Sequence, residues 1–210
     1  MSALFNACPS GALRNGGIER TPTMVTTAWH AAELTWGHGP RRLDVFLEPT
    51  CPFSVKTFNK LWVLLEHVGP DRLSITIRLQ SQPWHLFSGL IVRCILAAST
   101  LPEGREQARR VMAAVAARRE AFEFEHHCDG PNRDATPNDI IARLEHLSGV
   151  PLRAAFSTPD LDRAIKWQCR YARQNGIHTT PTFMIDGLVT PGMSSGDSIE
   201  AWADTLASQA

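Results

Sequence analysis

Apolar residues change their spacing twice in the first half of the chain. Residues 43–47 (LDVFL) form a mainly apolar run of the length expected for a buried strand. From Cys51 onward, apolar side chains recur at steps of three and four residues, which is the period of one helix face, until Gly69 ends the pattern. Residues 73–79 (LSITIRL) then alternate apolar and polar side chains, as a half-buried strand does. This order predicts two parallel strands joined by a right-handed helical crossover.

A long segment with helical patterning follows. Residues 84–157 are predicted to be almost entirely helical, and within them Thr136 and Asp139 resemble an N-terminal cap. Thr158-Pro159 is predicted to open a further helix that ends at Gly176. The helical segment is longer than an ordinary connection between strands, which indicates an insertion.

The pattern returns to strands near the C-terminus. Residues 182–185 form a short apolar run, Asp186-Gly187 is a hairpin signal, and a partner strand begins at Leu188. Residues 197–207 have the periodicity of an amphipathic closing helix. The order of elements predicts an α/β fold, in which a helical insertion separates an N-terminal βαβ half from a C-terminal ββα half.

By pattern, the chain divides into a tail, a core domain and the insertion. Residues 1–28 show no sustained periodicity and are predicted to be a mobile tail. Residues 29–82 and 158–210 are assigned to the core domain, and residues 83–157 to the insertion. Residues 32–36 are predicted to form a short edge strand of the core domain. A chain of this length can bury a substantial core without disulfides or metals.

Composition narrows the class of partner and the compartment. The 210 residues carry 21 basic and 21 acidic side chains, and the sequence pI is about 7.1. This balance gives no electrostatic reason to expect nucleic acid or a membrane surface as a partner. The apolar runs are shorter than the ~20 residues that a membrane-spanning helix needs. The first residues lack the basic start and the continuous apolar stretch of a secretory signal, so we expect a cytoplasmic location.

The five cysteines are expected to be free thiols. Their number is odd, no two are spaced as C-x-x-C, and a reducing compartment disfavours disulfides. Cys94 and Cys169 lie on apolar helix stripes, where cysteine commonly acts as a small buried hydrophobe, and Cys8 lies in the predicted tail. Cys128 follows two histidines, but no second ligand cluster has zinc-like spacing, so no metal site is expected. The remaining cysteine, Cys51, is the candidate for chemistry.

Cys51 lies where a predicted strand gives way to a helix, in the segment EPTCPFS of residues 48–54. A cysteine at the first turn of a helix faces unpaired backbone N–H groups and the positive end of the helix dipole, and both favour the thiolate. Pro52 suits the first helical position, because its missing N–H would be unpaired there anyway. Since the thiolate is the reactive form, Cys51 is the candidate nucleophile. The alternative is a cysteine that merely ends a strand.

A second signal lies far along the chain, in the segment HTTPTF of residues 178–183. A Thr-Pro before a short strand is common in turns, and cis bonds are only about 5–6% of X-Pro bonds in folded proteins, so this signal is weak alone. It becomes specific in combination with the strand–Cys51–helix unit.

These segments, together with the insertion and the hairpin, resemble the DsbA-like branch of the thioredoxin superfamily over residues 41–207. The resemblance implies a cis peptide bond before Pro181, with that proline against the sulfur of Cys51. It also implies that the backbone of Thr180 pairs with an extended peptide or thiol ligand, and that Phe53 lies on the rim of the site.

Ser54 departs from the pattern of this family. Dithiol members have a second cysteine at this position, which attacks the mixed disulfide and frees the substrate. A hydroxyl group cannot do this, so dithiol cycling within the motif is excluded. Two chemistries remain: exchange in which an external thiol such as glutathione resolves the intermediate, and binding or activation of a thiol ligand without net redox turnover.

The segment CPFS also resembles the motif of cysteine-type glutathione transferases and dehydroascorbate reductases, and CxFS resembles that of monothiol glutaredoxins. Those families place the cis proline much closer to the cysteine than Pro181 is to Cys51. The spacing favours the DsbA-like assignment, a grouping that also includes kappa-class glutathione transferases and hydroxychromene-carboxylate isomerases. A glutathione-dependent transferase or isomerase on the same fold, and a non-catalytic thioredoxin-like binding protein, stay open as alternatives.

Three further residues flank the expected site. Glu48 precedes Cys51 by three positions and is either a proton acceptor or a solvated strand end. Trp84 and His85 begin the insertion and are expected above the active-site end of the sheet. For His85 the alternatives are a satisfied helix-start histidine and a group that stabilises the thiolate. The arginines of residues 105–119 are expected on a solvated helix face.

Together, these observations predict a monothiol thiol-disulfide oxidoreductase. Its catalytic-site residues are Cys51, Ser54 and Pro181, and its substrate-binding residues are Pro52, Phe53, Thr180, Trp84 and His85. We expect no tightly bound cofactor, with glutathione as a candidate co-substrate and a thiol or disulfide compound as the partner. Kinship to dimeric relatives implies a homodimer. The motifs name no physiological substrate.

Overall fold

The computed structural model describes residues 31–125 and 129–208. The strands in this part of the chain are β1 (Thr35–Gly37), β2 (Arg41–Leu47), β3 (Leu73–Leu79), β4 (Thr182–Ile185) and β5 (Leu188–Val189). The α-helices are α1 (Pro52–Val68), α2 (Ser88–Ala98), α3 (Gly104–Ala117), α4 (Pro137–Ser148), α5 (Leu161–Gln174) and α6 (Ile199–Ser208), with short 3-10 turns at η1 (Arg119–Phe122) and η3 (Ala155–Ser157). The predicted tail, Cys8 and Cys128 lie outside the described residues.

The strands form one mixed sheet in the order β1-β3-β2-β4-β5, which places β2 at its centre. β2 and β3 pair in parallel, with Leu43 opposite Ile75, as the strand–helix–strand pattern predicts. β4 pairs with the other side of β2 in the antiparallel sense, with Phe46 opposite Thr182. The C-terminal ends of β2 and β3 therefore lie at the same edge of the sheet as the start of β4.

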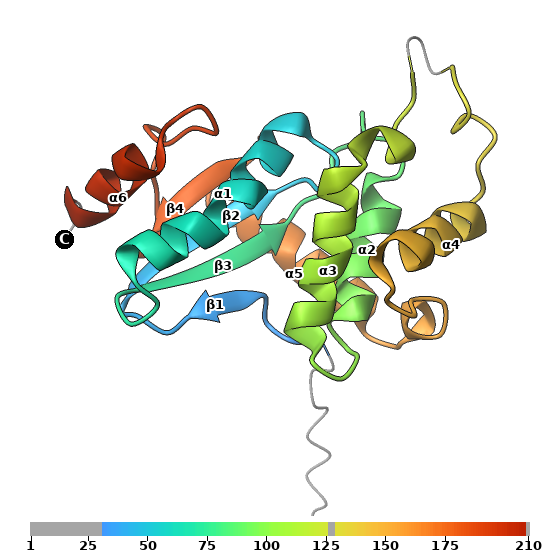
Figure 1. The fold of residues 1–210 in the computed structure, drawn as a ribbon, viewed down its shortest axis with the longest axis horizontal. Coiled ribbons are helices and arrows are strands. Elements are labelled where there is room, and N and C mark those ends of the chain that lie inside the picture. Colours follow the sequence, from blue (N-terminus) through green and yellow to red (C-terminus); the bar gives the residue numbers. More distant parts are fainter. Residues whose placement is uncertain (1–30, 126–128, 209–210) are drawn as a thin grey trace, which may run out of the picture.

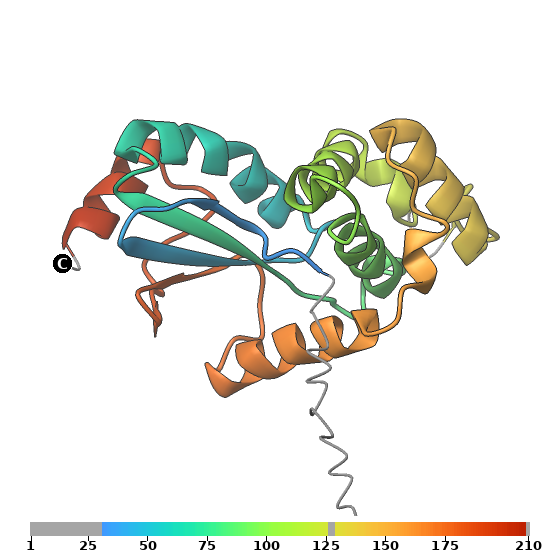
Figure 2. The ribbon, with the colours of Figure 1, turned by 90° about the horizontal axis from the view of Figure 1, so that it is seen from below.

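Helices cover both faces of the sheet (Figures 1 and 2). α1 and α6 lie on one face, where Trp202 of α6 packs on Phe183 of β4 with ring centroids 5.2 Å apart. α5 lies on the opposite face, where Ala172 packs with Phe46 and Met184 in a separate buried cluster. The alternation predicted for residues 73–79 is confirmed, because every second residue of β3 is buried in the main core.

The helices α2, α3 and α4 of the insertion lie together beside one end of the sheet (Figures 1 and 2). Their apolar faces belong to the same core cluster as α1 and the sheet, so the insertion is packed continuously onto the strands. The predicted capping box is confirmed: the Thr136 hydroxyl accepts a hydrogen bond from the Asp139 N–H, and the Asp139 carboxylate accepts one from the Thr136 N–H. The insertion thus forms a wall next to the strand ends.

Several predicted boundaries differ from the structure. The edge strand occupies Thr35–Gly37 rather than residues 32–36, because its pairing partner on β3 is Ser74 to Thr76. The described part of residues 123–136 is not helical, so the prediction of an almost entirely helical insertion was too broad. Helix α5 begins at Leu161 rather than at Thr158-Pro159, because Asp160 has a left-handed φ of 71° that a helix cannot include.

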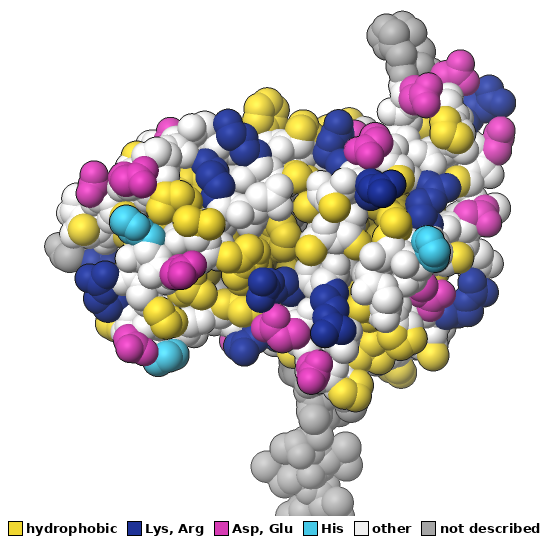
Figure 3. All heavy atoms as spheres, in the orientation of Figure 1, with side chains coloured by type: hydrophobic (Ala, Val, Ile, Leu, Met, Phe, Trp, Pro, Cys, Tyr) yellow, Lys and Arg dark blue, Asp and Glu magenta, His cyan; other side chains and the backbone are white. Residues whose placement is uncertain are grey.

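On the face drawn in Figure 3, basic and acidic side chains are interspersed and form no patch of one sign, in keeping with their equal numbers. None of the helices in the described ranges is long and apolar enough to span a membrane.

Candidate active site

Cys51 occupies the N-cap of α1, directly after the turn that leaves β2. Its backbone N–H donates to the carbonyl of Glu48 at 3.2 Å, and its carbonyl accepts from the N–H of Val55 at 2.9 Å. Pro52 stands at the first helical position, as the sequence predicts. The N-cap position places the Cys51 sulfur at the positive end of the helix dipole. Cys51 is only 7% exposed, so little of it is accessible to solvent.

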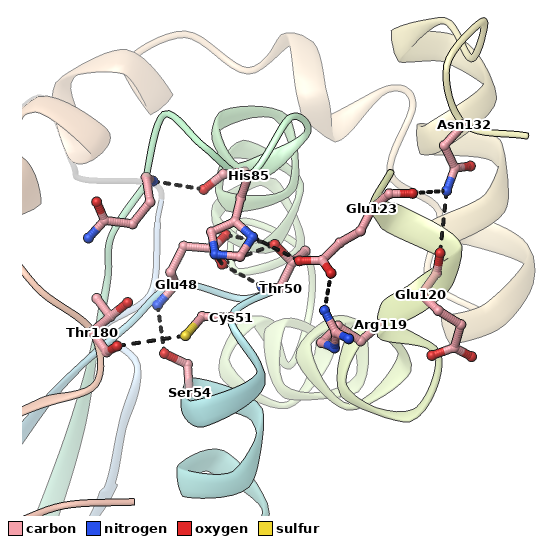
Figure 4. Close-up of polar contacts among 12 residues, drawn as sticks. Glu48, Thr50, Cys51, Ser54, His85, Arg119, Glu120, Glu123, Asn132 and Thr180 are labelled. Atoms are coloured by element: carbon pink, nitrogen blue, oxygen red, sulfur yellow. Dashed lines mark hydrogen bonds and ion pairs between the residues drawn. The ribbon is translucent and has the colours of Figure 1, made fainter. Parts of the chain in front are cut away.

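The second sequence signal lies directly against this sulfur. The Cys51 Sγ is 3.7 Å from the carbonyl oxygen of Thr180, which can accept a hydrogen bond from the thiol (Figure 4). The peptide bond between Thr180 and Pro181 is cis, the isomer that the family resemblance implies. Pairing of β4 with β2 brings the two segments together, because Thr182 lies opposite Phe46 just before the turn to Cys51.

Ser54 lies inside the first turn of α1 and is buried. Its hydroxyl accepts a hydrogen bond from the backbone N–H of Glu48 at 3.3 Å (Figure 4). The side chain therefore ties the end of the strand to the start of the helix. It supplies a structural bond at the position where dithiol relatives would have a second sulfur.

Glu48 is fully buried, which excludes the interpretation of this residue as a solvated strand end. Its carboxylate accepts hydrogen bonds from the Thr50 N–H at 2.9 Å and from the Thr50 hydroxyl at 3.0 Å. On the other side, the His85 Nε2 lies 3.6 Å from Glu48 Oε2. A buried carboxyl group requires such polar partners, because an unpaired one costs several kcal/mol to bury.

The His85 ring lies between two carboxyl groups, one from the core domain and one from the insertion (Figure 4). Its Nδ1 is 2.8 Å from Glu123 Oε1, and Glu123 also pairs with Arg119. The Asn132 side-chain amide donates to the Glu123 carbonyl at 2.6 Å, which fixes the backbone of this segment. The insertion therefore positions the polar partner of Glu48.

Sequence reasoning missed Glu123, Arg119 and Asn132. These residues follow α3 in a segment that contains no recognisable sequence motif. They join the site only because the insertion packs beside the strand ends. The satisfied-histidine interpretation of His85 agrees with the structure, since both ring nitrogens face carboxyl oxygens.

Exposed apolar side chains flank this arrangement. Phe53, in the first turn of α1, is 61% exposed, and Trp84 is 70% exposed, with its ring centroid 6.4 Å from that of His85. Leu86 is a further exposed apolar residue that the sequence did not single out. Phe53 lies two residues after Cys51 and Trp84 lies beside His85, and contact of either with a ligand at Cys51 stays a prediction.

No protein-family model and no curated protein matches the chain, whereas solved structures do. The crystal structure of a "putative protein-disulfide isomerase" from Pseudomonas syringae is 63% identical, with a TM-score of 0.82, and the match covers 85% of this chain and 99% of that one. The chain belongs to the DsbA-like family of thioredoxin-fold oxidoreductases.

More distant structures share the fold of this DsbA-like protein. A thioredoxin-like oxidoreductase from Silicibacter pomeroyi DSS-3 is 16% identical with a TM-score of 0.60, covering 86% of this chain and 94% of that one. The oxidoreductase DsbA from Xylella fastidiosa is 18% identical with a TM-score of 0.59, covering 85% of this chain and 89% of that one. The prediction of an α/β thioredoxin-like fold is confirmed.

Other candidates from the sequence lie away from Cys51 in this DsbA-like domain or have structural partners. Cys94 is buried on α2, and burial raises the pKa of its thiol to about 12. Arg109 pairs with Glu106 and lies over the Trp62 ring at 4.2 Å, so its charge already has partners. Among the described residues, no group of three His, Cys, Asp or Glu side chains is placed to hold a metal ion.

We predict that iodoacetamide at pH 8 leaves Cys94 unmodified in the folded protein. A thiol with a pKa of about 12 is almost wholly protonated at that pH, and the thiolate is the form that reacts. Peptide mass spectrometry after alkylation should show Cys94 modified only when urea is present during the reaction. Modification of native Cys94 at the rate seen in urea would contradict its burial.

We predict that His85→Ala lowers the free energy of unfolding by about 1–3 kcal/mol, because the buried Glu48 carboxyl loses a polar partner. Urea denaturation monitored by circular dichroism measures the change. His146, exposed on α4, offers the matched control, and His146→Ala should change stability by less than ~0.5 kcal/mol. Equal effects of the two substitutions would show that the Glu48–His85 contact contributes nothing.

Proposed function

We propose that this protein is a monothiol thiol-disulfide oxidoreductase or isomerase in which Cys51 is the nucleophile. The observation that carries the proposal is the position of the Cys51 sulfur: at the N-cap of α1 and 3.7 Å from the Thr180 carbonyl, beside the cis bond to Pro181. The high identity to a protein described as a disulfide isomerase supports the same class of chemistry.

In the first step, the Cys51 thiolate attacks one sulfur of a substrate disulfide. A bond forms between the Cys51 sulfur and that sulfur, while the substrate S–S bond breaks and its second sulfur leaves as a thiolate. The dipole of α1 and the backbone N–H groups of its first turn favour the negative charge on the attacking sulfur. The product is a mixed disulfide at Cys51.

The backbone at Thr180 and Pro181 is proposed to align the substrate. By family resemblance, an extended chain pairs with the backbone of Thr180, and this would hold the attacked sulfur next to Cys51. Phe53 and Trp84 contribute exposed apolar surface at the rim. Exposed aromatic side chains of this kind suit a peptide or a small thiol compound as the ligand more than a strongly charged macromolecule.

A second thiol must resolve the mixed disulfide, and Ser54 cannot supply it. In a net reduction, glutathione attacks the Cys51 sulfur of the mixed disulfide, which frees the substrate thiol and leaves a Cys51–glutathione disulfide. A second glutathione then attacks the glutathione sulfur, so that Cys51 is released and glutathione disulfide is the oxidised product. In an isomerisation, a thiol of the substrate attacks instead, so the disulfide moves and no electrons are consumed. Both routes require only one cysteine from the protein.

We predict that Cys51→Ala reduces the rate of glutathione adduct formation by at least ~1000-fold, because the nucleophile itself is removed. Intact-mass spectrometry after incubation with glutathione disulfide measures the adduct. The variants Cys94→Ala and Cys169→Ala, at the other described cysteines, should keep the wild-type rate. Adduct formation by Cys51→Ala at the wild-type rate would refute the assignment of the nucleophile.

We predict that Ser54→Cys converts the site to a dithiol that resolves its own mixed disulfide. Wild-type protein should accumulate one glutathione per chain until reductant is added, whereas the variant should end with an intramolecular disulfide and no glutathione. Intact mass combined with thiol counting distinguishes the two products. Ser54→Ala, which removes the hydroxyl without adding sulfur, should retain the glutathione adduct. Persistent glutathionylation of Ser54→Cys would show that the position cannot reach Cys51.

A further inference from the structure

A polar cavity of about 210 Å³ adjoins the loop that carries Thr180. It lies between the segment after β3, the C-terminal half of α5 and the residues that precede Pro181. Gln82, Cys169, Arg173, His178 and Thr179 are among the residues that line it. The proposed chemistry at Cys51 does not use this cavity.

The charge of the cavity has one sign. Arg173 and His178 are exposed at its wall, and neither side chain has an ion pair or hydrogen bond with any other described residue. None of the described residues that line it is acidic. An unpaired guanidinium presents a planar fork of donors that matches a carboxylate. The lining therefore favours an anionic group, and a carboxylate in particular.

The cavity is joined to the reactive sulfur through the backbone. Thr179 lines the cavity, and the carbonyl of the next residue, Thr180, lies 3.7 Å from the Cys51 sulfur. The Gln82 side-chain amide donates to the His178 carbonyl at 3.2 Å, which fixes this loop against the segment after β3. Since adjacent Cα atoms are ~3.8 Å apart, the part of the cavity wall at Thr179 lies next to the residue that contacts the Cys51 sulfur.

We propose that the cavity binds a carboxylate of a small anionic thiol of the glutathione class while the sulfur of that thiol is bonded to Cys51. This inference rests on the proposed thiol-disulfide exchange. Glutathione carries a carboxylate one residue to each side of its cysteinyl sulfur, so one of them can reach Arg173 during the reaction. The reacting bonds are those of the exchange itself: glutathione disulfide and the Cys51 thiolate give the Cys51–glutathione disulfide and one glutathione thiolate.

The test compares two disulfides that differ in charge. Rates of adduct formation at Cys51 are measured by intact mass with glutathione disulfide and with the neutral hydroxyethyl disulfide. Arg173→Gln should slow the reaction with glutathione disulfide about three- to tenfold, the range for loss of a partly exposed charged hydrogen bond. The same variant should leave the reaction with hydroxyethyl disulfide unchanged.

Arg170 provides the matched control, because it is exposed on the same helix but does not line the cavity. Arg170→Gln should leave both rates unchanged. If Arg173→Gln alters neither rate, or alters both equally, the carboxylate site is refuted while the exchange chemistry stands. If the wild-type protein reacts with neither disulfide, the proposed function fails. In that case a second measurement tests whether the cavity binds a glutathione-like ligand at all.

That second measurement uses Cys169 as a reporter inside the cavity wall. In the variant Cys51→Ser, S-methylglutathione, which has no reactive thiol, should slow labelling of Cys169 by N-ethylmaleimide. The protection should be lost with the doubly substituted variant that also carries Arg173→Gln. Labelling of Cys169 at the same rate with and without millimolar S-methylglutathione would overturn the inference.

Discussion

The candidate active site depends on one structural constraint, the pairing of β2 with a strand on each side. β3 follows β2 through α1, whereas β4 arrives only after the whole insertion, yet Thr182 of β4 must lie opposite Phe46 of β2. This register places the segment before β4 at the point where the chain leaves β2. The Thr180 carbonyl meets the Cys51 sulfur for this reason alone, and no local property of either segment would bring them together.

A second constraint is the burial of Glu48 beneath the site. A buried carboxyl group is unfavourable without polar partners, and the turn itself supplies only Thr50. The remaining partner, His85, is held in turn by Glu123 of the insertion. The insertion is therefore part of the site rather than an appendage, since it completes the polar environment on which the strand-to-helix turn rests. Changes in the packing of the insertion should therefore alter the surroundings of Cys51 through the contact between His85 and Glu48.

The replacement of a second sulfur by Ser54 shapes the proposed chemistry. In that proposal, Cys51 attacks a disulfide, and another molecule is needed to release the product. A protein of this kind gains from recognising the resolving thiol as well as the substrate. Arg173, in the wall of the cavity beside the Thr180 loop, supplies charge of the sign that the carboxylates of glutathione would require. The cytoplasmic location and the homodimer stay predictions of the sequence.

The sequence by itself determined the local elements of the core and singled out Cys51 as the candidate nucleophile. Residues 73–79 alternate strictly and Cys51 precedes a helix-starting proline, and such patterns depend on neighbours close in the chain. Family resemblance added the pairing of Cys51 with Pro181. Tertiary structure alone decided that Glu48 is buried, because burial depends on what packs above it. It also decided that Glu123 reaches the site and that Arg173 lines a cavity, since those contacts join segments whose separation in the sequence carries no periodic signal.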